Sequence, residues 1–162
     1  MATPAPKPVP DGMSTITTQL WFAGDCSAAI EFYRKAFGFE LCEPPALGPG
    51  GKGVMHAMMQ LGSGRIMMAD AWPGSWEHAP DGGATAGLFL YVEDCDAVQA
   101  QAVAAGCEEL FAVADMFWGD RMGKVKDPFG HCWGISTRTM DYTPEEVAAG
   151  QRAWMASMGA SE

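Results

Sequence analysis

The spacing of apolar and polar residues repeats itself along this chain after about seventy residues. In the first copy, the apolar run at residues 20–22 leads into a helical pattern that stops at Gly38. In the second copy, the run at residues 90–92 leads into a similar pattern that stops at Gly106. Each copy continues with two strand-like runs around a tight turn. A strand–helix–strands unit that occurs twice predicts two equivalent half-sheets.

The first copy begins with a threonine-rich, strand-like run and then changes to a helical period. Ala29, Tyr33 and Phe37 lie on one stripe of that helix, which a glycine ends. A loop rich in proline and glycine follows at residues 44–53, and Ser63-Gly64 is the predicted tip of a hairpin. The predicted strands and helix are residues 14–22, 27–37, 39–43, 54–61 and 65–71.

The second copy repeats this order and ends in an additional helix. Its predicted elements are a strand, a helix and three further strands, at residues 88–92, 96–105, 109–113, 122–126 and 132–137. Thr143 is a helix-capping residue, with Pro144 at the first helical position and two glutamates in the first turn. This last helix is expected to run to about Met158 as a surface or dimer-contact element.

The length of 162 residues is best explained by one domain over residues 14–162, preceded by a disordered tail at residues 1–13. Inside the domain we expect two modules and a connection between them: residues 14–71, 72–87 and 88–140, followed by the helix at 143–158. The long connection carries Trp72 and Trp76, and it is either a lid or partner surface or a simple linker.

The charge and the cysteines restrict the possible partners and compartment. The net charge of −10 argues against nucleic acid and anionic membranes, which both attract positive surfaces. No apolar run approaches the roughly 18 residues of a membrane span, and the N-terminus lacks the apolar segment of a secretory signal. The five cysteines show neither a C-x-x-C pair nor zinc spacing. We therefore expect free thiols in a reducing cytoplasm, although a catalytic cysteine is an alternative.

Several short motifs together resemble one known superfamily. The most specific are Phe-Trp-Gly-Asp-Arg at residues 117–121 and Asp-Pro-Phe-Gly-His at residues 127–131, and weaker ones lie at residues 32–38, 55–57 and 90–94. Over about residues 14–150 the chain resembles the vicinal oxygen chelate superfamily, which includes glyoxalase I and the bleomycin-resistance proteins, and within it the PhnB-like branch. The resemblance implies an α+β fold of two βαβββ modules that curl into an open barrel around a cavity, commonly in a homodimer. It does not determine a reaction.

The same resemblance implies where a metal would be held. Metal-dependent members place histidine, glutamine or glutamate on the first and last strands of each module, and the matching residues here are Thr17, Met67, Gly87 and Gly134. None of these is a strong metal ligand. A slip of one residue would bring Gln19 or Asp70 near such a site but no pair of histidines. We therefore expect no bound metal and no other cofactor.

Alternation along the strands predicts which side chains line the cavity. If Thr17 and Gly87 point inward, Gln19, Trp21, Phe89 and Tyr91 do too. Pairing of Gln60 with Met67 would bring His56, Met58 and Gln60 onto the inner face. Pairing of Gly134 with Gly123 would also bring Arg121, Val125, Cys132 and Ser136 onto it. The predicted ligand-binding residues are Gln19, Trp21, His56, Gln60, Phe89, Tyr91, Trp118, Arg121 and Ser136.

Two of these residues carry the chemical hypotheses. Arg121 either grips a carboxylate or phosphate of the ligand or forms a structural salt bridge with Asp120, Asp70 or Glu93. His56 is the best candidate for a general base, and otherwise it is an interior histidine. By contrast, His131 follows a tight turn and is expected to face outward.

Two functions from different classes remain possible. The first is a metal-independent protein that binds a small, partly apolar, aromatic or anionic molecule. The second is a glyoxalase-like lyase, isomerase or dioxygenase. An open sheet edge and the apolar residues of the last helix, Trp154 and Met158, favour a homodimer in either case.

Overall fold

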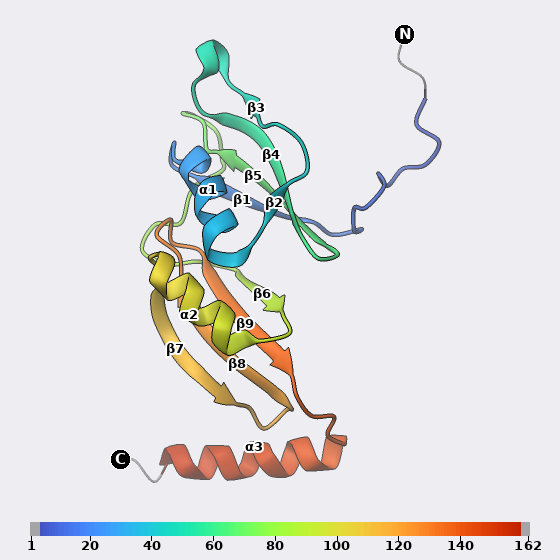
Figure 1. Cartoon of the computed structure of the whole chain (residues 1–162), viewed down its shortest axis with the longest axis vertical. Coiled ribbons are helices and arrows are strands. Elements are labelled where there is room, and N and C mark those ends of the chain that lie inside the picture. Colours follow the sequence, from blue (N-terminus) through green and yellow to red (C-terminus); the bar gives the residue numbers. More distant parts are fainter. Residues whose placement is uncertain (1–3, 160–162) are drawn as a thin grey trace. The chain divides into compact units, whose positions relative to one another are not determined.

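The fold consists of two similar units, as the repeat in the sequence predicts (Figure 1). The computed structural model describes residues 4–159, and the boundary between the units lies between Asp81 and Gly82. Each unit follows the order β-α-β-β-β, and the first contains one extra short strand. The predicted α+β class and the paired modules are therefore confirmed.

The first unit carries a mixed sheet with the strand order β1-β5-β4-β2, and β3 pairs with β4. The edge strand β1 pairs with β5 in parallel, while β4 is antiparallel to its neighbours. The elements are β1 Thr18–Phe22, α1 Cys26–Phe37, β2 Glu40–Leu41, β3 Ala46–Leu47, the 3-10 helix η1 Pro49–Gly51, β4 Val54–Leu61 and β5 Gly64–Asp70.

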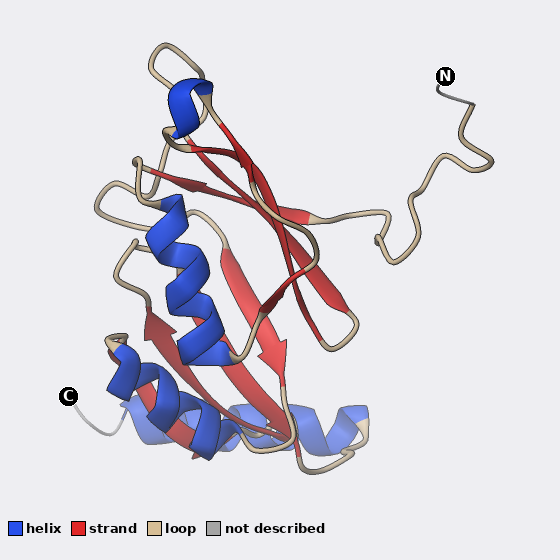
Figure 2. Ribbon diagram, turned by 45° about the horizontal axis from the view of Figure 1, so that its top comes forward, coloured by secondary structure: helices blue, strands red, loops and turns tan. Residues whose placement is uncertain are grey.

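The core of the first unit lies between α1 and one face of this sheet (Figure 2). The predicted helical stripe is buried there, and its Tyr33 is fully buried against Phe22, with ring centroids 6.2 Å apart. Met59 and Met68 are buried on the same face of the sheet. Gly38 ends α1 at a φ of 80°, in the left-handed region that glycine tolerates best.

The buried carboxylate of Asp70 fixes the start of α1. Its Oδ1 accepts hydrogen bonds from the backbone N–H groups of Gly24, at 3.0 Å, and Cys26, at 2.9 Å. Its Oδ2 accepts one from the N–H of Val54, at 2.7 Å. By accepting from Cys26, the carboxylate satisfies an N–H group that the start of a helix leaves unpaired. Asp70 is therefore a structural residue that joins β5, β4 and α1.

The second unit carries a sheet with the strand order β6-β9-β8-β7 and two helices. Its β6–β9 pair is parallel and the others are antiparallel. The elements are β6 Gly87–Tyr91, α2 Cys95–Ala105, β7 Glu108–Asp115, β8 Asp120–Lys126, β9 Cys132–Arg138 and α3 Pro144–Gly159.

The core of the second unit lies between α2 and one face of its sheet (Figure 2). Trp133, Ile135 and Val125 are fully buried on that face. Gln99 of α2 lies directly above Gly123, where an added Cβ would come within 2.0 Å of its Oε1 atom. Glycine at this position therefore allows the close approach of the helix to the sheet.

The last helix, α3, starts with the predicted cap. Glu146 N–H donates to Thr143 Oγ1 at 3.3 Å, and Thr143 N–H donates back to Glu146 Oε2 at 2.8 Å. The helix packs on Phe117, whose ring lies 5.9 Å from that of Trp154. Half of the Trp154 side chain remains exposed, as do Met155 and Met158.

The element bounds differ from the predictions mainly at the ends. The first strand begins at Thr18 rather than Ser14, and the predicted loop at 44–53 contains β3 and η1. The residues at the tip of the first hairpin are Gly62 and Ser63, because Leu61 pairs with Gly64. The predicted tail begins with residues 1–3, which lie outside the described residues, and its remainder forms no helix or strand.

Candidate functional site

The face of the first sheet that points away from α1, here called the first face, brings together most of the residues predicted in this half. Leu20 and Phe22 are buried toward α1, so Gln19 and Trp21 lie on the opposite side. Met67 pairs with both Gln19 and Met58. The side chains on the first face are Gln19, Trp21, His56, Met58, Gln60, Arg65 and Met67.

The hairpin register on this face differs from the predicted one by two residues. Gln60 lies opposite Arg65 rather than Met67, which pairs with Met58. Because side chains alternate with a period of two, this error leaves every residue on its predicted face. The placement of Gln19, Trp21, His56 and Gln60 on one face is therefore confirmed, while their contact with a ligand stays a prediction.

Arg65 is a residue of this face that the sequence reasoning missed. Its Nε–H donates to Gln60 Oε1 at 3.0 Å, and its Nη1–H donates to the carbonyl oxygen of Asp11 at 2.9 Å. Gln60 Nε2–H in turn donates to the carbonyl oxygen of Gly62 at 3.0 Å. Arg65 precedes Met67 by two positions, so the alternation that placed Met67 inward could have found it.

His56 lies on β4 opposite Ala46 and is half-buried. It makes no hydrogen bond or ion pair with any residue between 4 and 159. No carboxylate therefore orients its ring within this part of the chain. Its catalytic role stays a prediction.

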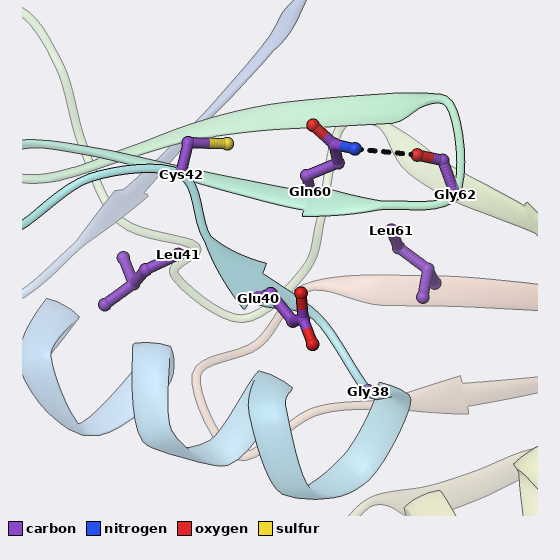
Figure 3. Close-up of a pocket in the computed structure, with 7 residues that line it drawn as sticks. All are labelled: Gly38, Glu40, Leu41, Cys42, Gln60, Leu61 and Gly62. Carbon is purple, nitrogen blue, oxygen red and sulfur yellow. Dashed lines mark hydrogen bonds between the residues drawn. The ribbon is translucent and has the colours of Figure 1, made fainter.

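Pockets of the first unit lie away from the centre of the first face, and two of them include or adjoin predicted residues. One, of about 220 Å³, lies where β2 pairs with β4 (Figure 3), and Gln60 forms part of its wall. Its lining is Gly38, Glu40, Leu41, Cys42, Gln60, Leu61 and Gly62. The other, of about 840 Å³, is lined by Ala23, Ala71 and residues of the connection between positions 72 and 81.

The connection is anchored at its start by Trp72. An added Cβ at Gly48 would come within 2.4 Å of the Trp72 ring, which shows how closely the indole lies on the β3–η1 loop. Trp76, in contrast, is 82% exposed.

The corresponding face of the second sheet, which points away from α2 and is here called the second face, carries an aromatic pair. Phe89 and Tyr91 are 53% and 66% exposed, and their ring centroids lie 6.3 Å apart. Phe89 covers Gly134, where an added Cβ would come within 2.7 Å of its ring. Glycine at position 134 thus lets the ring lie flat on the sheet.

A buried carboxylate, Asp120, holds this face together. It accepts hydrogen bonds from the Tyr91 hydroxyl, at 3.1 Å, from Trp118 Nε1–H, at 3.1 Å, and from Arg138 Nη1–H, at 3.2 Å. Burial works to raise the pKa of Asp120, but the bonds from Arg138, Trp118 and Tyr91 outweigh it and lower the pKa. Asp120 therefore stays ionised and orients two predicted ligand-binding residues, a role that the sequence did not indicate.

The hydrogen bond between Tyr91 and Asp120 also shifts the tyrosine. This bond is the main cause that raises the pKa of Tyr91, and burial adds to it. Ser136, another predicted residue, is fully buried and pairs with Tyr91 on β6 and with Met122 on β8. Tyr91, Trp118 and Ser136 are thus brought together around Asp120.

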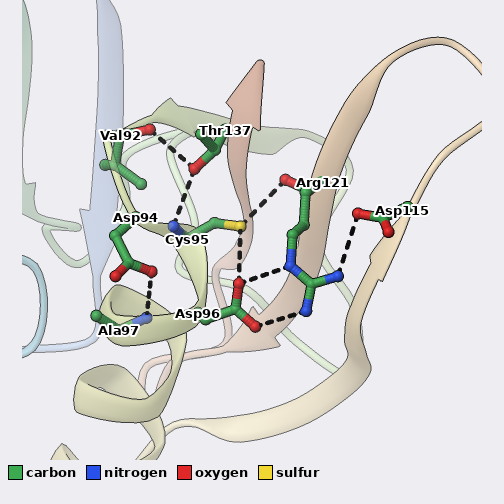
Figure 4. Close-up of polar contacts among 8 residues, drawn as sticks. All are labelled: Val92, Asp94, Cys95, Asp96, Ala97, Asp115, Arg121 and Thr137. Carbon is green, nitrogen blue, oxygen red and sulfur yellow. Dashed lines mark hydrogen bonds and ion pairs between the residues drawn. The ribbon is translucent and has the colours of Figure 1, made fainter. Parts of the chain in front are cut away.

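Arg121 does not lie on this face, and that prediction is wrong. Gly134 pairs with Lys124 rather than Gly123, so the predicted register was off by one residue, which reverses the side of every β8 residue. Arg121 points to α2, where Nε–H and Nη2–H each donate to Asp96 at 2.7 Å and Nη1–H donates to Asp115 at 3.1 Å (Figure 4). It is a structural clamp on the start of α2.

Two further predictions on this half need correction. Val125 was placed inward with Arg121, but it is buried beneath α2 for the same reason of register. His131 was expected to face outward, but it is only 7% exposed. Its backbone N–H donates to Asp127 Oδ1 at 2.9 Å, which folds the turn back toward the core.

The residues that the resemblance places at metal positions carry no imidazole or carboxylate, and two of them have other contacts. Thr17 donates its hydroxyl to the carbonyl oxygen of Ser14 at 3.3 Å, and Gly134 is covered by Phe89. Asp70, the alternative that a slip would offer, is occupied by three backbone N–H groups. In the part of the chain that the structure describes, no three His, Cys, Asp or Glu residues gather in a way that could hold a metal ion.

The paired βαβββ units are typical of one superfamily, and a comparison with known families identifies the same one. The model of the glyoxalase/bleomycin resistance protein/dioxygenase superfamily matches residues 16–135, and the chain belongs to this superfamily. No helix within residues 4–159 is long and apolar enough to cross a membrane.

Among individual proteins, the chain is 37% identical over 131 residues to an uncharacterized protein of Mycobacterium tuberculosis strain H37Rv, covering 77% of this chain and 75% of the relative. The crystal structure of TioX from Micromonospora sp. ML1 is similar at 25% identity and a TM-score of 0.61, covering 78% of this chain and 99% of TioX. A PhnB protein from Bacillus cereus, described as a putative 3-demethylubiquinone-9 3-methyltransferase, shares the fold at 20% identity and a TM-score of 0.59, covering 76% and 99%.

Proposed function

We propose that this protein binds a small, partly aromatic organic molecule and does so without a metal ion. The observation that carries the proposal is the exposed pair Phe89–Tyr91, in which Asp120 holds the Tyr91 hydroxyl and the Phe89 ring lies 6.3 Å from the Tyr91 ring. Exposed aromatic rings that are fixed in orientation offer a flat apolar surface at little cost in conformational entropy. A planar ligand is the partner that fits such a surface best.

The first face supports the same function with a different set of groups. Trp21, Met58 and Met67 supply apolar surface, and Gln19 and Gln60 supply polar groups beside it. A largely apolar lining with a few polar groups is typical of small-molecule sites. Methionine side chains adapt their shape to a ligand more easily than branched ones do.

Metal independence is proposed because the positions that hold the metal in the metal-dependent members here carry threonine, methionine and glycine. Thr17, Met67, Gly87 and Gly134 together offer no imidazole or carboxylate. We therefore assign the protein to the members of the superfamily that bind a ligand without catalysis. We also propose that it belongs to the PhnB-like branch and that it acts in the cytoplasm.

A fluorescent probe tests the binding function. N-phenyl-1-naphthylamine is a neutral aromatic molecule whose emission rises in apolar surroundings. We expect the protein to bind it, and Phe89→Ala to weaken the affinity about tenfold or more, since burial of an aromatic side chain contributes about 1.5–3 kcal/mol. Val103→Ala, at an exposed position of α2, is the control and leaves the affinity unchanged.

The proposal fails if the wild-type protein does not bind the probe, or if Phe89→Ala and Tyr91→Ala bind it as tightly as the wild type. Circular dichroism of each variant confirms that the fold is retained before affinities are compared.

An enzyme of the glyoxalase type is the second candidate, and the position of His56 is the observation that favours it. His56 shares the first face with Gln60 and Arg65, so an imidazole and two donor groups lie on one surface. The test is turnover of the hemithioacetal of methylglyoxal and glutathione, with nickel or zinc added. Activity that His56→Ala abolishes supports an enzyme, and no turnover in either protein excludes this reaction.

A further inference from the structure

We infer that Arg65 is an anion-binding residue of the first face, and that the ligand carries a carboxylate, sulfonate or phosphate group. This inference rests on the proposed function, because it specifies the class of ligand that the first face would bind. Arg65 takes the anion-binding role that the sequence suggested for Arg121, whose charge is already neutralised by Asp96 and Asp115.

The first argument is charge. The chain contains twice as many acidic as basic residues, 20 against 10, so carboxylates are plentiful partners for its cations. Arg34, Arg121 and Arg138 all form ion pairs. Arg65 forms none within residues 4–159, although it is half-buried. A partly desolvated guanidinium without a counter-ion is costly, and a bound anion would offset that cost.

The second argument is orientation. Gln60 Oε1 accepts from Nε and the Asp11 carbonyl oxygen accepts from Nη1, so two contacts hold the guanidinium plane. Neither bond uses Nη2, which makes no hydrogen bond within the described part of the chain. A planar group held in this way presents donors in a fixed geometry, which suits the two oxygens of a carboxylate, sulfonate or phosphate.

The third argument is the apolar surface that continues from Arg65 along the sheet. Met67 follows two residues along β5, and Trp21 lies opposite Ala69, two residues further on. At a rise of about 3.3 Å per residue, the path from Arg65 to the level of Trp21 is about 13 Å. A ligand with its anionic end at Arg65 would place an aromatic body of two rings over Met67 and Met58, toward Trp21.

A pair of probes separates charge from shape. 8-Anilinonaphthalene-1-sulfonate differs from N-phenyl-1-naphthylamine only by its sulfonate group. We expect Arg65→Gln to weaken the sulfonate probe about tenfold to a hundredfold, as loss of a charge-assisted hydrogen bond implies, and the neutral probe less than twofold. Arg65→Lys, which keeps the charge but not the planar fork, should give an intermediate loss. Arg152→Gln, which removes the exposed arginine of α3, is the matched control and changes neither affinity.

Three results from the variants would overturn the inference. They are unchanged sulfonate affinity in Arg65→Gln, an equal loss for both probes, or an equal loss in Arg152→Gln. The second result would mean that Arg65 acts through packing, and the third that only net charge matters. Absence of sulfonate binding by the wild-type protein also contradicts it. The neutral probe and Phe89→Ala report on the proposed function separately, so the two ideas fail independently.

Discussion

At the scale of single residues, two buried carboxylates with the same chemistry perform different tasks. Within residues 4–159, Asp70 accepts from backbone N–H groups and fixes a helix start. Asp120 accepts from side chains, among them the aromatic residues Tyr91 and Trp118. The partners, rather than the residue type, therefore distinguish the structural aspartate from the one that orients a candidate site.

The bond between Tyr91 and Asp120 predicts the titration of the phenol. Because Asp120 stabilises the neutral hydroxyl, the pKa of Tyr91 should lie above its usual value of about 10. The difference between the absorbance titrations at 295 nm of wild type and Tyr91→Phe measures this pKa. In Asp120→Asn it should fall toward the usual value. A midpoint near 10 in the wild-type protein would show that the bond does not form in solution.

The same pair predicts the pH range over which the second face stays ordered. The raised pKa of Tyr91 means that its contribution to stability is complete below about pH 10 and is lost as pH rises through the folded-state value. The lowered pKa of Asp120 means that its contribution is complete above about pH 4 and is lost on acidification through the folded-state value. Neutral pH lies inside both limits.

At the scale of elements, the two units solve the same problem with different residues. Asp70, at the end of β5, caps the start of α1. In the second unit, Thr137 of β9 takes this role: its Oγ1 accepts from Cys95 N–H at 2.9 Å and donates to the Val92 carbonyl oxygen at 3.0 Å (Figure 4). The repeat is thus preserved in geometry where it is not preserved in residue identity.

Replacing Asp70 should therefore destabilise the first unit strongly. Asp70→Ala leaves three N–H groups without their acceptor, two of them buried, at an expected cost of about 3 kcal/mol. Urea unfolding measures the free energy of unfolding, and Asp81→Ala, at an exposed aspartate, is the control with a change below about 0.5 kcal/mol. Equal stability of the two variants would refute the role given to Asp70.

The elements also show what the sequence could and could not predict. The helices and the two-fold repeat follow from apolar period and glycine stops, so they were predicted to within one or two residues. Hairpin register depends on the turn, which short patterns specify poorly. A two-residue error left Gln60 on its face, but a one-residue error moved Arg121 to the wrong one. Asp120 was missed because its donors come from β6, β9 and the loop before β8, which no local pattern connects.

At the scale of the whole molecule, the last helix predicts self-association. Trp154, Met155 and Met158 are each about half exposed on α3, and large apolar side chains grouped on one helix commonly mark an interface. We expect light scattering to give the mass of a homodimer at tens of micromolar, and Trp154→Glu to shift it toward the monomer. Val103→Glu is the control, because it adds the same charge on α2. A monomer mass for the wild-type protein contradicts this prediction.

The central claim is that this member of the superfamily binds an aromatic ligand without a metal. Calorimetric titration of N-phenyl-1-naphthylamine into protein treated with a chelator and then dialysed tests it most directly. The account predicts the same dissociation constant before and after this treatment, and a weaker one in Phe89→Ala. Binding that disappears with the chelator and returns with one equivalent of zinc, nickel, iron or manganese would contradict it.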